Sequence, residues 1–245
     1  MRYAWVRDVS VRRRSLGVAL RAAATPEAYA RDVVSRISDQ RPRRRAAADP
    51  VTPDAGVFQR ALDGIRSAAL RPEMVIEEVP APSRLAPHAV ALSGEVVPSR
   101  LEDEDPIATG RFVVLHDPEG PEPWEGTWRA VTYAKAQMEP EVGHDPLAGQ
   151  AGWSWLTDAL EQAELGWTAA AGTVTCVTSE SFGALADREP SVELEIRASW
   201  TPVLTDGDEA REMAAHLGAW GDLLCTLAGL PPLPEGVVAL SGVRR

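Results

Sequence analysis

Two of the four histidines stand in the same tripeptide, His116-Asp117-Pro118 and His144-Asp145-Pro146. A histidine beside an aspartate can relay a proton or bind a metal ion. If the turns that carry the two pairs converge at a cleft, the four side chains would form an unusual catalytic site. The alternative is structural, because proline disfavours helical geometry in the residue before it, so that each aspartate begins a turn. We favour the turn and keep the four residues as candidates for catalysis.

The sequence offers no other recognisable catalytic or cofactor motif. It contains no phosphate-binding glycine loop, no H-E-x-x-H, no C-x-x-C and no G-x-S-x-G. We expect Cys176 and Cys225 to be small core residues, and the acidic run 102–105 to be a solvated loop and not a cation site. We therefore predict no metal and no cofactor, and a non-catalytic protein is favoured over an enzyme.

Tryptophan is the more unusual feature, because seven of the eight follow residue 53. Trp153 and Trp155 are two positions apart where a helix is predicted to begin, so both cannot face one core, and Trp124 stands in a Pro/Gly turn. Exposed aromatic side chains beside loops suit a protein-binding surface. We predict a binding surface that contains these three tryptophans, with Arg111 and Arg129 as polar partners on the solvent face of adjacent strands.

Charge is unevenly distributed along the chain, whose net charge is −11. Residues 1–50 carry twelve basic and five acidic side chains (+7), and the other 195 residues carry 13 and 31 (−18). An acidic body is not drawn to polyanions, so nucleic-acid binding is expected only of the N-terminal segment. Every basic residue except Lys135 is arginine, a bias typical of GC-rich coding sequence and no evidence for phosphate binding.

The elements that must position these residues follow from hydrophobic periodicity. Residues 1–53 have the composition of a basic, disordered extension, and 54–245 that of a single domain. Helices are predicted from residue 54 to the proline at 72, at 153–164 and at 207–228, and strands at 74–79, 88–97, 109–116, 126–138, 167–179 and 192–200. The order αββββαββα with short connections predicts an α+β fold, a mostly antiparallel sheet of about six strands with helices packed on one face.

The chain has no apolar run near the roughly 20 residues that a membrane-spanning helix needs. Near the N-terminus, Arg21 interrupts the apolar run 16–20 before it reaches the length of the apolar region in a signal peptide. We expect a cytoplasmic protein with no membrane partner.

Several segments together resemble one family. Among them are Leu70-Arg71-Pro72-Glu73, Gly152-Trp153-Ser154-Trp155-Leu156 and Trp220-Gly221-Asp222-Leu223-Leu224-Cys225. From about residue 58 to 240 the chain is similar to an actinobacterial family of uncharacterised proteins, the domain of unknown function numbered three thousand. The resemblance implies no activity, cofactor or catalytic residue. Members are often encoded near a ribonuclease of the D type, which implies a link to RNA metabolism.

Three functions remain open, in decreasing order of support. The first is a binding or adaptor protein that acts on a protein partner through an exposed face. The second is an enzyme with a loop-built site of His116, Asp117, His144 and Asp145, which requires the two pairs to lie close together. The third is an accessory protein of RNA metabolism that binds RNA through residues 1–53. The sequence does not fix the oligomeric state.

Overall fold

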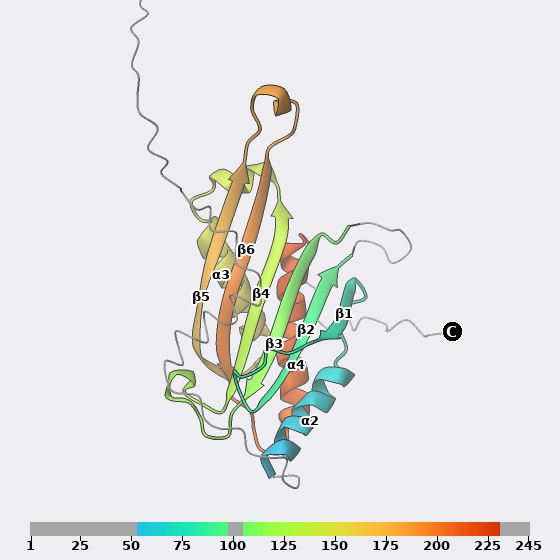
Figure 1. Cartoon of the computed structure of the whole chain (residues 1–245), viewed down its shortest axis with the longest axis vertical. Helices are drawn as coiled ribbons and strands as arrows, with labels where there is room; N and C mark the ends of the chain where they lie inside the picture. The colour runs from blue at the N-terminus through green and yellow to red at the C-terminus, as the bar shows by residue number, and fades with distance from the viewer. Residues whose placement is uncertain (1–52, 98–104, 231–245) are drawn as a thin grey trace, which may run out of the picture.

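The described part of this chain, residues 53–97 and 105–230 of a computed structural model, is built from three long helices and one six-stranded sheet (Figure 1). The helices are α2 (Pro53–Ser67), α3 (Ala148–Gln162) and α4 (Glu209–Leu227). The strands are β1 (Met74–Val79), β2 (His88–Val96), β3 (Ala108–His116), β4 (Trp128–Met138), β5 (Trp167–Ser179) and β6 (Ser191–Pro202). This order confirms the predicted α+β class. The predicted N-terminal extension and residues 102–104 of the acidic run lie outside the described residues.

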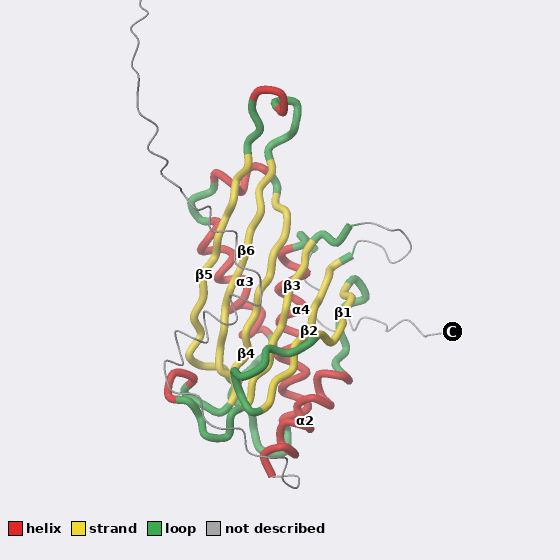
Figure 2. Tube along the Cα trace, viewed as in Figure 1, coloured by secondary structure: helices red, strands yellow, loops and turns green. Residues whose placement is uncertain are grey.

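The sheet has the order β1-β2-β3-β4-β6-β5, and every neighbouring pair is antiparallel. Strands β1 to β4 follow one another as a meander (Figure 2). The chain then passes through α3 to the outer edge, forms β5 there, and returns as β6 between β5 and β4. The two edges of the sheet are therefore β1 and β5.

All three helices pack on the same face of the sheet, and α3 and α4 lie behind the strands in Figure 1. Alternate residues of the strands meet the apolar stripe of α4, in which Met213, Leu217, Trp220 and Leu224 are buried. Glycines allow the closest approaches. A Cβ at Gly94 would lie 2.5 Å from the Trp220 ring, and one at Gly64 would lie 1.9 Å from the Ala210 carbonyl oxygen, where α2 crosses α4.

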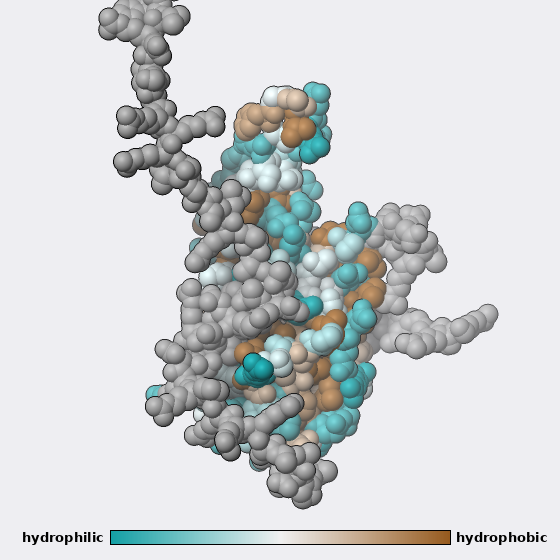
Figure 3. All heavy atoms as spheres, in the orientation of Figure 1, coloured by the Kyte–Doolittle hydropathy of each residue, from teal (hydrophilic) through white to brown (hydrophobic). Residues whose placement is uncertain are grey.

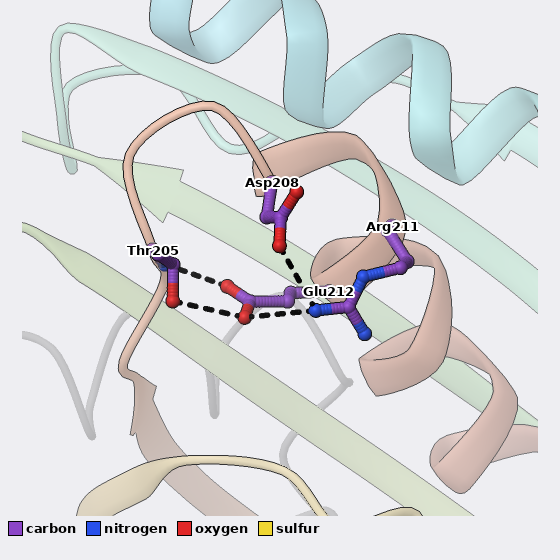
Figure 4. A network of polar contacts seen from close by, with 4 residues as sticks. All are labelled: Thr205, Asp208, Arg211 and Glu212. Carbon is purple, nitrogen blue, oxygen red and sulfur yellow. Dashed lines mark hydrogen bonds and ion pairs between the residues drawn. The ribbon is translucent and has the colours of Figure 1, made fainter.

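Polar contacts hold the start of α4 against the loop that precedes it (Figure 4). The Glu212 carboxylate accepts hydrogen bonds from the Thr205 backbone N–H at 2.6 Å and from its hydroxyl at 3.1 Å. Arg211 bridges Asp208 at 3.2 Å and Glu212 at 3.3 Å. Acidic groups in the first turn also interact favourably with the positive end of the helix dipole. We interpret this network as structural, because it fixes where α4 begins.

Two predictions about α3 and β5 were wrong in detail. Helix α3 begins at Ala148 and not at residue 153, and the glycine at 152 lets it approach the sheet, since a Cβ there would lie 3.0 Å from Val174 Cγ1. Cys225 is buried as expected, whereas Cys176 is exposed because β5 is the outermost strand. No helix in the described part of the chain is long and apolar enough to cross a membrane.

Candidate functional site

The face of the sheet opposite the helices is divided into an apolar and a polar half. Near the ends of β3 and β4 that carry His116 and Trp128, a second, smaller hydrophobic cluster forms from Ala91, Val113, Leu115, Val131 and Trp124. The segment after β1 packs against this cluster. Toward the other end of the same strands, the side chains are charged or hydroxylated. We call this second half the polar face.

The polar face is centred on a row of residues that the strand register aligns. Arg111 of β3 is opposite Tyr133 of β4, which is opposite Arg197 of β6, which is opposite Thr173 of β5. Arg111, Tyr133 and Arg197 are half-buried. The Tyr133 hydroxyl donates a hydrogen bond to Glu195 at 2.9 Å, and the Arg197 guanidinium lies 5.5 Å from the centre of the Tyr133 ring. These contacts join the tyrosine to a cation through its ring and to a carboxylate through its hydroxyl.

Opposite charges are paired along the same face. Arg197 Nε contacts Glu195 at 2.5 Å, Lys135 Nζ contacts Glu193 at 2.6 Å, and Gln137 donates to Glu193 at 3.4 Å. Pairs that are partly exposed add little to stability, typically about 0–1 kcal/mol. Their consequence here is a fixed pattern of positive and negative groups on two neighbouring strands, β4 and β6.

The pKa of Tyr133 is raised well above its ordinary value, first by burial and then by the hydrogen bond to Glu195. At neutral pH the phenol therefore stays protonated and acts as a hydrogen-bond donor. A tyrosine in this state is suited to recognition and not to service as a base or nucleophile.

Trp124 was predicted to be exposed, and the structure shows the opposite. Its side chain is 2% exposed and packs against Leu115 and Val131 in the second hydrophobic cluster. The Trp124 backbone carbonyl accepts a hydrogen bond from the Thr201 hydroxyl, which ties its turn to β6. The Pro/Gly-rich turn folds back over the apolar half of the face, and its tryptophan becomes a core residue.

Arg129 lies on the predicted face of β4 but is also buried, at 2% exposure. Its guanidinium reaches across β6 and donates to Ser199 Oγ (2.7 Å), Thr201 Oγ1 (3.0 Å) and the Ala169 carbonyl (2.9 Å). Ala169 has a φ of +48° and lies where the β5–β6 register shifts between residues 168 and 171. Arg129 thus stabilises a β-bulge, and burial lowers the pKa of the guanidinium.

Trp153 and Trp155 lie on α3, on the other side of the sheet from Arg111. Both are half-buried and pack against the main core, so neither is fully exposed. The Trp153 ring covers Gly172 of β5, where a Cβ would lie 2.7 Å from it. The structure therefore does not join these tryptophans and Arg111 into one surface.

The two His-Asp pairs are not brought together. His116 ends β3, which places it beside Trp128 at the start of β4, whereas His144 and Asp145 follow the far end of β4. Eleven residues of extended strand separate the two ends by roughly 30 Å. Asp117 accepts the Glu119 backbone N–H at 3.0 Å and Asp145 accepts that of Leu147 at 2.8 Å, so each aspartate begins a turn. The catalytic site that needed their convergence does not form.

His116 instead belongs to a stack of rings beneath α2. The centre of its ring lies 4.2 Å from that of Trp128, 5.8 Å from that of His88 and 6.3 Å from that of Phe58. An open pocket of about 440 Å³ adjoins it, with Trp128, Pro202, Val203 and Glu209 among its lining residues. Glu209 already accepts two hydrogen bonds from Arg60, at 2.8 and 2.9 Å. In the described residues no three His, Cys, Asp or Glu side chains gather in a way that could hold a metal ion.

A family model described as a protein of unknown function, DUF3000, matches residues 54–238. The chain belongs to the DUF3000 family. This confirms the family that the sequence resembles, and residues 1–53 lie outside the matched range. No curated protein and no solved structure matches the chain.

For this DUF3000 chain, sequence reasoning missed most of the polar face. Tyr133, Lys135, Glu193, Glu195 and Arg197 were not singled out, although the alternation along 192–200 had predicted one solvent-exposed side for that strand. The sequence did not show which strands lie side by side in the sheet. Since β6 returns between β4 and β5, residues that are 62 positions apart become direct partners, as Tyr133 and Glu195 do.

Proposed function

We propose that this DUF3000 chain is a non-catalytic binding protein, an adaptor in the cytoplasm, that contacts a protein partner through the polar face. One observation carries the proposal. Paired charges and a tyrosine form a fixed array on β4 and β6, on the side of the sheet that the described helices leave uncovered.

The composition of the array favours a protein partner. Tyrosine and arginine are enriched in protein interfaces, where a rigid ring and a planar cation give large contact areas. Glu193 and Glu195 would repel phosphate groups, so the same surface is unsuited to a nucleic acid. A partner that fits has acidic and basic side chains of its own in the complementary order.

Lys135 offers a direct test, because it is the single lysine of the sequence and lies on the polar face with its side chain 39% exposed. An amine-reactive cross-linker can join this chain to a partner only through Lys135 or the N-terminal amine. We expect a stoichiometric partner recovered from a lysate of the source organism to cross-link at Lys135. Cross-links confined to the N-terminal amine would contradict the proposal.

A charge exchange tests the surface without removing an ion pair. The double variant Lys135→Glu with Glu193→Lys keeps the internal pair but reverses its direction. It should weaken the affinity for the partner at least about tenfold. The matched control exchanges Arg66 and Glu78, an exposed pair 3.1 Å apart between α2 and β1. Equal binding by both double variants, or recovery of no partner by the unmodified chain, would refute the proposed surface.

A further inference from the structure

The two edges of the sheet differ in how they are protected against further pairing. Natural sheets protect exposed edges with short strands, charges, prolines or bulges. Strand β1 has six residues, contains Glu77 and Glu78, and is followed by Pro80. Strand β5 has thirteen residues, none of them charged and none of them proline. Among the described strands, only the edge at β5 lacks the first three of these protections.

The bulge limits the open edge to one regular stretch. After the register shift, residues 171–179 pair without interruption with β6, and in the described part of the chain no strand pairs with their other side. Eight of these nine residues are exposed, and Val174 is half-buried. The stretch is therefore accessible along its whole length.

Exposed apolar side chains lie at one end of the same edge. Phe182 and Leu185, which are 76% and 48% exposed, follow β5 at the tip of the β5–β6 hairpin, where Figure 3 shows a hydrophobic surface.

We infer that the partner of this edge is β5 of a second copy of the chain. The two strands run antiparallel about a two-fold axis at Thr175, the midpoint of 171–179, and two six-stranded sheets become one. Thr175 then faces its own copy, and Thr173 faces Val177. This dimer goes beyond the proposed function and does not depend on it, because the polar faces of both copies remain free.

The uncharged composition of β5 supports a second copy as the occupant. With no charged side chain on β5, no like charges meet in the joined strands, and threonine pairs across antiparallel strands are favourable. The whole chain carries −11, so two copies repel each other at a distance. Salt screens such repulsion, with a Debye length of about 8 Å at physiological ionic strength. Dimerisation should therefore become tighter as salt is added.

Sedimentation of the full chain gives the first test. We expect a dimer, and a monomer at every concentration would overturn the inference.

Cross-linking through Cys176 gives the second test. In this register the two Cys176 residues are diagonal neighbours roughly 7–8 Å apart, within reach of a short bis-maleimide. Cys225 is buried and should not react. A cross-linked dimer should form and be absent from Cys176→Ser, and a failure to cross-link would refute the register.

Complementary substitutions at the axis separate this interface from any other. Thr175→Lys and Thr175→Glu each place like charges opposite each other and should weaken dimerisation at least about tenfold, while an equimolar mixture should restore it. Val75→Lys, on the edge at β1, is the control and should leave the dimer unchanged. Thermal melting checks that each variant is folded. Failure of the mixture to restore the dimer, or equal loss in Val75→Lys, would show that β5 is not the interface.

Discussion

The indole Nε1 of Trp200 on β6 donates a hydrogen bond to Nδ1 of His216 on α4, at 3.3 Å. Both side chains are completely buried, so this contact joins the centre of the sheet to the central helix. Burial lowers the pKa of His216 to about 4, although a backbone hydrogen bond with Gly166 acts in the opposite direction. The imidazole is therefore neutral at pH 7, and Nδ1 can accept the hydrogen bond from the indole N–H.

This histidine makes the stability of the fold depend on pH. Its pKa in the folded state lies below the ordinary 6.5, so the unfolded chain binds the proton more readily between pH 6.5 and 4. Stability should fall by about 3 kcal/mol as the pH decreases through that window. His216→Asn keeps an acceptor for Trp200 and has no titrating group. Urea unfolding at several pH values should show a flatter profile for this variant, and identical slopes would contradict the assignment.

The packing of Trp220 on glycine predicts opposite effects for two substitutions to alanine. A Cβ at Gly94 would lie 2.5 Å from the Trp220 ring, so Gly94→Ala should lower the free energy of unfolding by about 1–3 kcal/mol. A Cβ at Gly218 on α4 would meet nothing within 4 Å. Gly218→Ala should therefore stabilise the helix by about 0.5–1 kcal/mol. Chemical denaturation measures both, and a neutral Gly94→Ala would show that α4 can shift away from the sheet.

The fold could be predicted because its signals are local. The alternation along 192–200 and the three- and four-residue spacing in 213–227 indicate a buried side in each element, and the structure confirms both. Ser199, on the side of β6 predicted to be exposed, is buried as well. Short connections indicated antiparallel neighbours. The position of β6 inside the sheet carries no local signal, because it depends on α3 leading the chain to the edge before β5 forms.

The candidate site was harder to predict because exposure depends on distant segments. Trp124 stands in a turn rich in proline and glycine, which is typical of the surface, yet the turn folds over Leu115 and Val131. Arg129 has the pattern of a solvent-facing residue, yet three acceptors on β5 and β6 enclose it. Arg111 lies on the predicted face and is half-buried. No spacing within the sequence reports which neighbour will cover a given side chain.

The ion pair between α2 and α4 predicts a second, more acidic transition. Arg60 donates two hydrogen bonds to Glu209, which lowers the pKa of that buried carboxyl to about 2 in spite of burial. A lowered carboxyl pKa stabilises the fold above the ordinary 4.5, and the contribution is lost as the pH falls toward 2. Glu209→Gln should melt below the wild type at pH 7, with the difference vanishing near pH 2. A difference that does not change with pH would point to packing alone.

Arg129 should prove to be a structural residue of β5 and not a contact for a partner. In Arg129→Met the Ala169 carbonyl and the Ser199 and Thr201 hydroxyls lose their donor, while the new side chain still fills the space along β4. Buried acceptors left unpaired should lower the free energy of unfolding by about 1–3 kcal/mol. Arg188→Met, at an exposed position in the hairpin, is the control and should stay within about 0.5 kcal/mol of the wild type.

Hydrogen exchange distinguishes this local role from a general loss of stability. The positive φ of Ala169 is unfavourable for a residue with a side chain, so the bulge should relax once the guanidinium no longer holds its carbonyl. Amides of residues 168–171 should then exchange much faster in Arg129→Met, whereas exchange in the middle of β3 should be accelerated only as far as the loss of global stability dictates. Uniform acceleration across the sheet would mean that Arg129 stabilises the fold as a whole and that the bulge forms without it.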